Sequence, residues 1–474
     1  MKLQQFGKWP GVMLLLTVAS GVWAQQPMSL QDCRELAIAN NKKMKIAELQ
    51  VHAAKIRKEE AFTKYLPGVD ATGVYLRNQK EINLLEHDAY LPVGTVGADG
   101  KWTLRPDQVQ MVDGKPLPKD YALLPKDAMT VDDRNTALIQ VGLTQPLYMG
   151  GKIRAYNQLA GLSEQLSVSG RDLELQNLIQ ETDEAYWQVV SLVNRKKLAD
   201  KYVETLKKFE HDIGVMFQTG VATKADVLSV KVKLNEAEIV ALKVEDGLSL
   251  SRMNLNQICG LRTDTVYSLK EETVGLEVRS PEPANMEQVY ARRPEIVSLE
   301  LATQIYRKKE KIALSDYLPA VALTANYVAM APSFFEGIST KLDGMWSVGV
   351  GIKAPVFHWG ASRKNMRNAK IQTSIAEYQL QEAKEKIELQ VSQSEFKMKE
   401  VGKKMEMAAG NVERAEENLK LANLGFQEGT IPVLNVLEAQ TAWLAARSGL
   451  IDAQIEAKLC EVYLRKAYGT LNAE

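Results

Sequence analysis

An internal repeat constrains this chain more than any other feature of its sequence. A constant interval of 209 residues separates matching positions of the two halves: Pro146 and Pro355, Gly220 and Gly429, and Gly260 and Gly469. About 115 residues therefore repeat without a net insertion or deletion. Because loops tolerate changes of length and rigid elements do not, we expect the repeated element to be rigid throughout.

The repeated element has the pattern of a long helix. Residues spaced alternately by four and three run through the second half: Ile387, Val391, Ser394, Met398, Val401, Met405, Ala408, Val412, Ala415, Leu419, Ala422 and Phe426. This is the heptad period of a coiled coil, and the first half keeps it with three polar interruptions. From Lys152 or Ala361, each helix is expected to run for about 67 residues, or roughly 100 Å.

Alternating strands precede the long helices. The segment at about 135–147 and the runs Val321–Tyr327 and Trp346–Ile352 place apolar side chains at every second position, and the segment at about 68–77 follows this pattern more loosely. Each alternating pattern belongs to a run of about ten residues, enough to cross a bilayer as a tilted strand. Four strands cannot close a membrane barrel, and open strand edges are not tolerated in hydrocarbon. Other copies of the chain must therefore complete it.

Prolines stand at the four helix–strand joints, and the segment between the first two prolines carries an insertion. The prolines are Pro67, Pro146, Pro319 and Pro355. Proline ends helices and favours extended structure before it. The first pair is 79 residues apart and the second 36. Most of the excess falls in residues 91–127, which are rich in proline and glycine, so we expect an irregular, exposed and extracellular loop over about 80–132.

The N-terminus has the features of an export signal. Lys2 and Lys8 precede an apolar stretch at 11–22, and small residues at Val22 and Ala24 predict cleavage after Ala24. The apolar stretch is shorter than the ~20 residues of a membrane-spanning helix. Cys33 lies beyond this cleavage site, so we expect no lipid anchor. Lys plus Arg and Asp plus Glu both number 59, so charge gives no indication of nucleic-acid binding.

Signatures of enzymes and metal sites are lacking in the sequence. Gly150-Gly151-Lys152 resembles part of a phosphate-binding loop, but Pro146 and Ile153 replace residues that such a loop requires. The four histidines and three cysteines have neither metal-ligand spacing nor a disulfide framework. We therefore predict no catalytic residue, no metal and no cofactor.

One segment carries a family resemblance. Glu417–Gly429 (ENLKLANLGFQEG), continued by Val436–Gln440 (VLEAQ), resembles the E-N-L-x-x-A…F-x-x-G…V-L-x-A-Q stretch of the TolC-type outer-membrane efflux proteins. The YLP and QPLY motifs and the two-fold repeat agree with it. The resemblance implies a mixed α+β membrane protein, a homotrimer in which four strands per chain make a twelve-stranded β-barrel. A periplasmic α-helical coiled-coil barrel would continue it.

The resemblance also implies partners and a domain plan. A periplasmic adaptor (membrane fusion) protein and an inner-membrane pump would join the trimer, which would lie in outer-membrane lipid of a Gram-negative cell with its helices in the periplasm. The expected plan is a signal peptide (1–24), a first repeat (25–261), a linker (262–284) and a second repeat (285–474). The favoured function is a passive exit duct for drugs or other solutes. Type I protein secretion and, less strongly, a periplasmic coiled-coil or adaptor protein are the alternatives.

Two groups of candidate functional residues follow. The turns that end the long helices are expected to be adaptor-docking tips: Gln218, Gly220, Val221 and Thr223, with Gln427, Gly429, Thr430 and Pro432. Thr223 and Asp226 have the spacing of a capping box, and Pro432 suits a first helical turn. Because acidic rings can select cations, Glu413, Glu416 and Glu417 are candidates for a periplasmic gate. A solvated outer face is the alternative for these three.

Overall fold

The computed structural model describes residues 27–270, 284–337 and 339–472. The chain divides into two compact units. The sheet unit consists of Lys55–Gly161 and Gln304–Ser374, and the helical unit of Met1–Ala54, Leu162–Thr303 and Ile375–Glu474. The predicted signal peptide, with its cleavage after Ala24, and most of the predicted linker at 262–284 lie outside the described residues.

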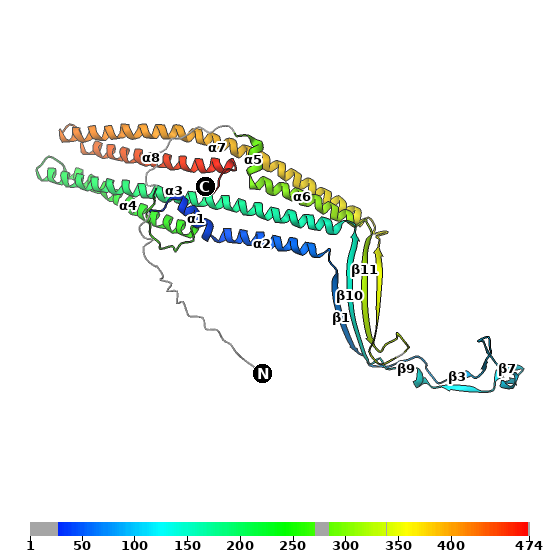
Figure 1. The fold of residues 1–474 in the computed structure, drawn as a ribbon. Coiled ribbons are helices and arrows are strands. Elements are labelled where there is room, and N and C mark those ends of the chain that lie inside the picture. The colour runs from blue at the N-terminus through cyan, green and yellow to red at the C-terminus, as the bar shows by residue number, and fades with distance from the viewer. Residues whose placement is uncertain (1–26, 271–283, 338, 473–474) are drawn as a thin grey trace, which may run out of the picture. The chain divides into compact units, whose positions relative to one another are not determined.

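Four antiparallel strands form the main sheet of the sheet unit (Figure 1). They are β1 (Gly68–Arg77), β10 (Asn135–Met149), β11 (Ala320–Ala331) and β12 (Asp343–Lys353), and they lie in the order β1-β10-β11-β12. Among the described strands, β1 pairs with β10 and β12 with β11, so both outer strands keep an edge without a partner in this chain.

One face of this sheet is apolar and exposed. In the register, Val141 stands opposite Tyr327, which stands opposite Trp346. Because side chains alternate along a strand, these three residues share a face with the other alternate apolar positions. On β12 this face is 75% exposed at Trp346 and 71% exposed at Ile352. The opposite face has Thr144, Asn326, Ser347 and Gly349 among its residues. The sequence pattern predicted this division into an apolar and a polar face.

The insertion between β1 and β10 is a regular ribbon rather than an irregular loop. Eight short strands form four antiparallel pairs, β2 with β9, β3 with β8, β4 with β5, and β6 with β7. Their bounds are Ile82–Asn83 (β2), Ala89–Pro92 (β3), Thr95–Val96 (β4), Trp102–Thr103 (β5), Val109–Val112 (β6), Lys115–Pro118 (β7), Tyr121–Leu124 (β8) and Thr130–Val131 (β9). Two short 3₁₀ helices, Pro106–Gln108 and Lys126–Met129, complete it. The expectation of irregular structure was wrong, because the eight strands of the insertion pair with one another as two-stranded ladders.

The prolines occupy the joints with one exception. Pro67 and Pro319 immediately precede β1 and β11, and Pro355 follows β12. Pro146 instead lies inside β10, where the register with β11 shifts between Pro146 and Tyr148. Pairing of β10 with β1 ends at Thr144, so Pro146 has no neighbour on that side that needs its missing N–H group.

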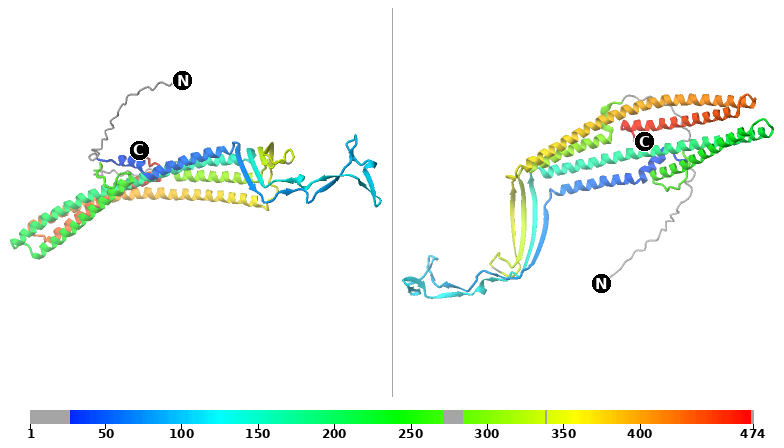
Figure 2. Two further views of the ribbon diagram at one scale, coloured as in Figure 1. Left: turned by 90° about the horizontal axis from the view of Figure 1, so that it is seen from below. Right: turned by 180° about the vertical axis from the view of Figure 1, so that it is seen from behind.

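The helices repeat as the sequence predicted. They are α1 (Leu30–Asn40), α2 (Lys42–Thr63), α3 (Lys152–Gln218), α4 (Lys224–Ile258), α5 (Met286–Arg292), α6 (Pro294–Ser315), α7 (Ala361–Gln427) and α8 (Val433–Ala467). Helices α3 and α7 each have 67 residues, and α4 and α8 each have 35. In the helical unit, α4 lies beside α3 and α8 beside α7 (Figure 2). No helix in the described ranges is long and apolar enough to cross a membrane.

The heptad stripe is the packed side of the second hairpin. Val401 is fully buried, and Val391 and Met398 are nearly so. One hydrophobic cluster joins residues of α3, α4, α7 and α8 near the two turns, and a second joins α1, α3 and the end of α4. Both clusters lie in the helical unit.

A buried ion pair fastens α1 to α3. Nε and Nη2 of Arg34 donate hydrogen bonds of 2.7 and 2.6 Å to the two carboxylate oxygens of Asp183. The Asp183 side chain is fully buried and that of Arg34 is 9% exposed. Such a bidentate arrangement satisfies both charges at once. An exposed pair, Lys43 with Glu181 at 2.8 Å, joins α2 to α3 nearby in the chain.

Candidate functional site

The first candidate tip is the turn between α3 and α4. Gly220 has φ +82, the left-handed conformation that glycine adopts without steric cost. Its N–H donates to the carbonyl oxygen of Phe217 at 3.1 Å, and the N–H of Val221 donates to that of Met216 at 2.9 Å. The second bond has the pattern of a Schellman cap, which satisfies carbonyls left open at a helix end.

The second candidate tip, between α7 and α8, has the same backbone. Gly429 has φ +66. Its N–H donates to the carbonyl oxygen of Phe426 at 3.0 Å, and the N–H of Thr430 donates to that of Gly425 at 2.8 Å. Each of these residues lies 209 positions after its counterpart in the first turn, so the repeat extends to individual hydrogen bonds.

The two tips differ in how the return helix begins. The Asp226 N–H donates to Thr223 Oγ1 at 3.2 Å, and the Thr223 N–H donates to Asp226 Oδ2 at 2.9 Å. The predicted capping box is therefore present, and such a cap contributes about 1 kcal/mol. The Thr223 hydroxyl, followed by its N–H, lowers the pKa of the Asp226 carboxyl. In the second tip Pro432 takes the N-cap position, one residue before α8, and makes no side-chain cap.

The tips share a core but leave several predicted residues exposed. The rings of Phe209 and Phe426, one from each hairpin, lie 5.5 Å apart in an edge-to-face arrangement. In contrast, Val221 is 70% exposed. Exposed residues also include Gln218, Gln427 and Thr430. The structure therefore brings the two predicted turns onto one packed cluster while their outer side chains face away from it.

A groove beside the tips was not predicted from the sequence. It has a volume of about 740 Å³ and lies between α4 and α8. Its apolar lining includes Leu228, Val232 and Leu434, each at least 54% exposed. The sequence held a signal for it, because Leu228, Val232 and Ile239 step by four and seven along α4. This second heptad stripe is two positions from the buried stripe that contains Val230, and it therefore lies on nearly the opposite face of α4.

The candidate gate residues do not form one cluster of unpaired carboxylates. Glu416 forms an ion pair with Arg447 of α8 and accepts a hydrogen bond of 3.4 Å from Nε1 of Trp443. Glu417 lies 3.5 Å from Lys420 on its own helix. Glu413 is exposed. Only Glu416 therefore holds its position through a contact with the neighbouring helix among these described interactions.

The described residues contain no group of three or more His, Cys, Asp or Glu side chains that could hold a metal ion. The four histidines lie on different elements or on the loops between them: His52 in α2, His87 before β3, His211 in α3 and His358 before α7. The geometry that characterises this chain is thus a sheet with an exposed apolar face in one unit, and two paired helical turns in the other.

Comparison with known proteins agrees with this geometry. The family model "Outer membrane efflux protein" matches residues 33–261 and 285–470. TolC of Escherichia coli K12 is 20% identical over 362 residues, which cover 74% of this chain and 72% of TolC. The solvent efflux pump outer membrane protein SrpC of Pseudomonas putida is 22% identical, over 73% of this chain and 74% of SrpC. A membrane protein of Pseudomonas aeruginosa superimposes with a TM-score of 0.73 at 16% identity, covering 93% of both chains.

The fold consists of long helices and a four-stranded sheet in two repeated halves, as in this solved membrane protein. The chain belongs to the outer membrane efflux protein family, the TolC family, whose model spans nearly all of its described residues. It is an outer-membrane efflux channel of Gram-negative type with periplasmic helices, and proteins of this family are not enzymes. The predicted resemblance and fold class are confirmed.

Proposed function

We propose that the chain is the subunit of a homotrimeric exit duct, through which an inner-membrane pump drives drugs or other solutes with the help of a periplasmic adaptor. The observation that carries the proposal is the sheet with two open edges, β1 and β12, and an exposed apolar face. In hydrocarbon, backbone groups at an open edge cost several kcal/mol each. Pairing β12 of one copy with β1 of the next closes a twelve-stranded barrel.

The helical tips are the proposed adaptor contacts. Gln218, Gly220, Val221 and Thr223 supply one turn, and Gln427, Gly429, Thr430 and Pro432 supply the other. The glycines would act through backbone conformation, since nothing lies within 4 Å of a Cβ placed at either one. Val221, an exposed apolar side chain at the end of a hairpin, is the residue best placed to contact a partner. The groove between α4 and α8 would extend the contact.

The absence of a lipid anchor also belongs to the proposal. Cys33 is the cysteine nearest the predicted cleavage site after Ala24. Its side chain is fully buried inside α1, so a lipid on its sulfur would have to displace the surrounding core.

A matched pair of valines tests the docking role. Val221 and Val266 are both 70% exposed in the helical unit, and only Val221 lies at a tip. We expect Val221→Glu to lower export at least tenfold, because a charge desolvated at an apolar contact costs several kcal/mol, while Val266→Glu exports normally. Export is measured as drug susceptibility of a strain that depends on this protein, and trimers are measured by crosslinking in mild detergent.

Each result has a separate meaning. Export by Val221→Glu equal to that of the unchanged protein would refute docking at this turn. Monomers alone after crosslinking of the unchanged protein would refute the trimer. If a strain that lacks this protein keeps normal drug resistance but fails to secrete a protein substrate, the duct belongs to type I secretion instead.

A further inference from the structure

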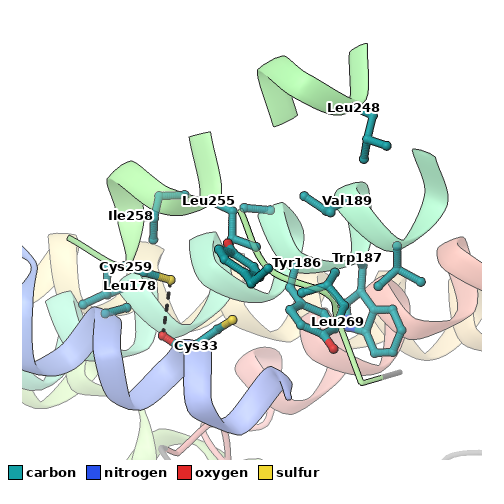
Figure 3. Close-up of a cluster of buried hydrophobic side chains, with 14 of the residues drawn as sticks. Cys33, Leu178, Tyr186, Trp187, Val189, Leu248, Leu255, Ile258, Cys259 and Leu269 are labelled. Atoms are coloured by element: carbon teal, nitrogen blue, oxygen red, sulfur yellow. Dashed lines mark hydrogen bonds between the residues drawn. The ribbon is translucent and has the colours of Figure 1, made fainter. Parts of the chain in front are cut away.

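Two cysteines from distant parts of the sequence meet in the core of the helical unit. Cys33 comes from the first turn of α1, and Cys259 is the C-cap of α4. Both are completely buried. The Cys259 sulfur donates to the carbonyl oxygen of Cys33 at 3.6 Å. Figure 3 shows both sulfur atoms in the space between α1 and the end of α4, among Leu178, Tyr186 and Leu269.

Contacts that do not involve sulfur hold these two segments together. The side-chain amide of Asn41 donates to the carbonyl oxygen of Ile258 at 3.0 Å, and that of Asn40 donates to the carbonyl oxygen of Cys259 at 3.5 Å. A Cβ placed at Gly260 would lie 2.5 Å from the Cβ of Asn40. The cap of α4 therefore lies in direct contact with α1, and the cysteines are brought together by packing that does not depend on them.

The third cysteine provides a contrast within the same unit. Cys460, also buried, packs against Met398, Val401 and Ala457, and its cluster contains no other cysteine. Burial raises the pKa of its thiol, as expected for a cysteine that acts as a small apolar residue. The pKa of the Cys259 thiol is instead lowered, chiefly by the side chain of Cys33. The two thiols thus interact with each other, whereas Cys460 does not interact with a second thiol.

We propose that Cys33 and Cys259 are joined by a disulfide bond in the mature protein. The proposal rests on the proposed function in one respect, because an outer-membrane protein crosses an oxidising compartment, the periplasm, as it is translocated. All three cysteines carry thiols in the structure. Oxidation removes two electrons and two protons from the pair and passes them to a protein disulfide, which is reduced to a dithiol. Exchange takes place as the chain folds, before α1 covers both sulfurs.

The bond would connect the start of the first repeat to its end. The two residues are 226 positions apart in sequence, and the loop between them contains β1, β10 and the whole first helical hairpin. The burial that excludes oxidants from the folded pair would equally exclude reductants. The bond is therefore expected to persist in folded protein treated with a mild thiol reductant.

Differential alkylation of the full chain tests the proposal. Protein from the outer-membrane fraction is denatured without reductant and treated with an isotopically light alkylating reagent. It is then reduced and treated with the heavy form of the reagent, and its peptides are identified by mass spectrometry. We expect heavy label on Cys33 and Cys259 and light label on Cys460. Without the reduction step, the peptides of Cys33 and Cys259 should appear as one crosslinked species.

Two variants serve as controls. Cys33→Ser should shift Cys259 to light label, while Cys460→Ser should leave both partners heavy. Light label on Cys33 and Cys259 in outer-membrane protein would overturn the disulfide and leave the proposed function intact. If the protein is absent from the outer membrane, the proposed function fails. The pair is then judged by refolding the reduced chain with oxidised glutathione, where closure of Cys33 with Cys259 supports the proposal and its failure to close overturns it.

Discussion

The buried ion pair between Arg34 and Asp183 leads to a quantitative prediction. Replacing Asp183 with Leu leaves a guanidinium group that is 9% exposed and has lost both charged hydrogen bonds. Breaking one side of a buried pair typically costs about 3–5 kcal/mol. Because arginine cannot give up its proton in a protein, it cannot relieve this cost by becoming neutral. We expect most of the loss to appear as easier opening of α1, which the pair holds to α3.

Hydrogen exchange of the α1 amides, followed by mass spectrometry on the folded protein, measures this opening. Since each 1.4 kcal/mol is a factor of ten, Asp183→Leu should accelerate exchange in Leu30–Asn40 by roughly 10²–10³-fold. Arg34→Met should cost less, because burial raises the pKa of the Asp183 carboxyl and favours its neutral form once Arg34 is gone. The double variant removes both charges and should return to within about tenfold of the original rate.

The exposed pair provides the matched control. Lys43 and Glu181 have side chains that are 55% and 43% exposed, and exposed pairs contribute at most about 1 kcal/mol. Glu181→Gln should therefore change the rate of hydrogen exchange of the α1 amides by no more than about fivefold. The reasoning is refuted if Asp183→Leu has an effect as small as Glu181→Gln, or if the double variant opens as readily as Asp183→Leu alone.

Two further predictions concern the gate and the ribbon. If the carboxylates of α7 select cations, changing Glu416 and Glu417 together to Gln should lower the single-channel preference for cations. An unchanged preference would remove both residues as gate candidates. The variant Arg447→Gln keeps the charge of Glu416 and removes only its ion pair with α8. Replacing residues 82–131 with a short turn should preserve trimers and abolish binding of antibodies raised against the ribbon, because the four-stranded sheet makes its pairings without it. Loss of folding in that variant would assign the ribbon a structural role.

The elements that repeat were predictable, and those that do not repeat were not. Both long helices begin where the constant interval placed them, at Lys152 and Ala361, because a helix cannot absorb an insertion without rotating its buried stripe. The ribbon was missed because proline and glycine usually break strands. Pro92, Pro116 and Pro118 lie inside its two-stranded ladders, where one edge of every strand is open and a missing N–H group is tolerated.

The candidate site divides in the same way. The capping box at Thr223 follows from local spacing and was predicted. The glycine of each turn, which is left-handed in the structure, was among the predicted tip residues. The ion pair of Glu416 with Arg447 and the meeting of Cys33 with Cys259 depend on contacts between separate helices. No local pattern in the sequence encodes such contacts, because the partners are determined by how the helices pack.

The two turns have matching backbones but different side chains at the start of the return helix. A partner that binds both turns would therefore contact two different surfaces. The first return helix starts with the carboxylate of Asp226, whose pKa is lowered, and Asn435 occupies the corresponding position in the second. Around a ring of three such chains, turns with and without this negative charge would alternate. A partner with a single kind of binding end would then meet two inequivalent turns. Half-occupancy of the ring would be a natural intermediate in its assembly.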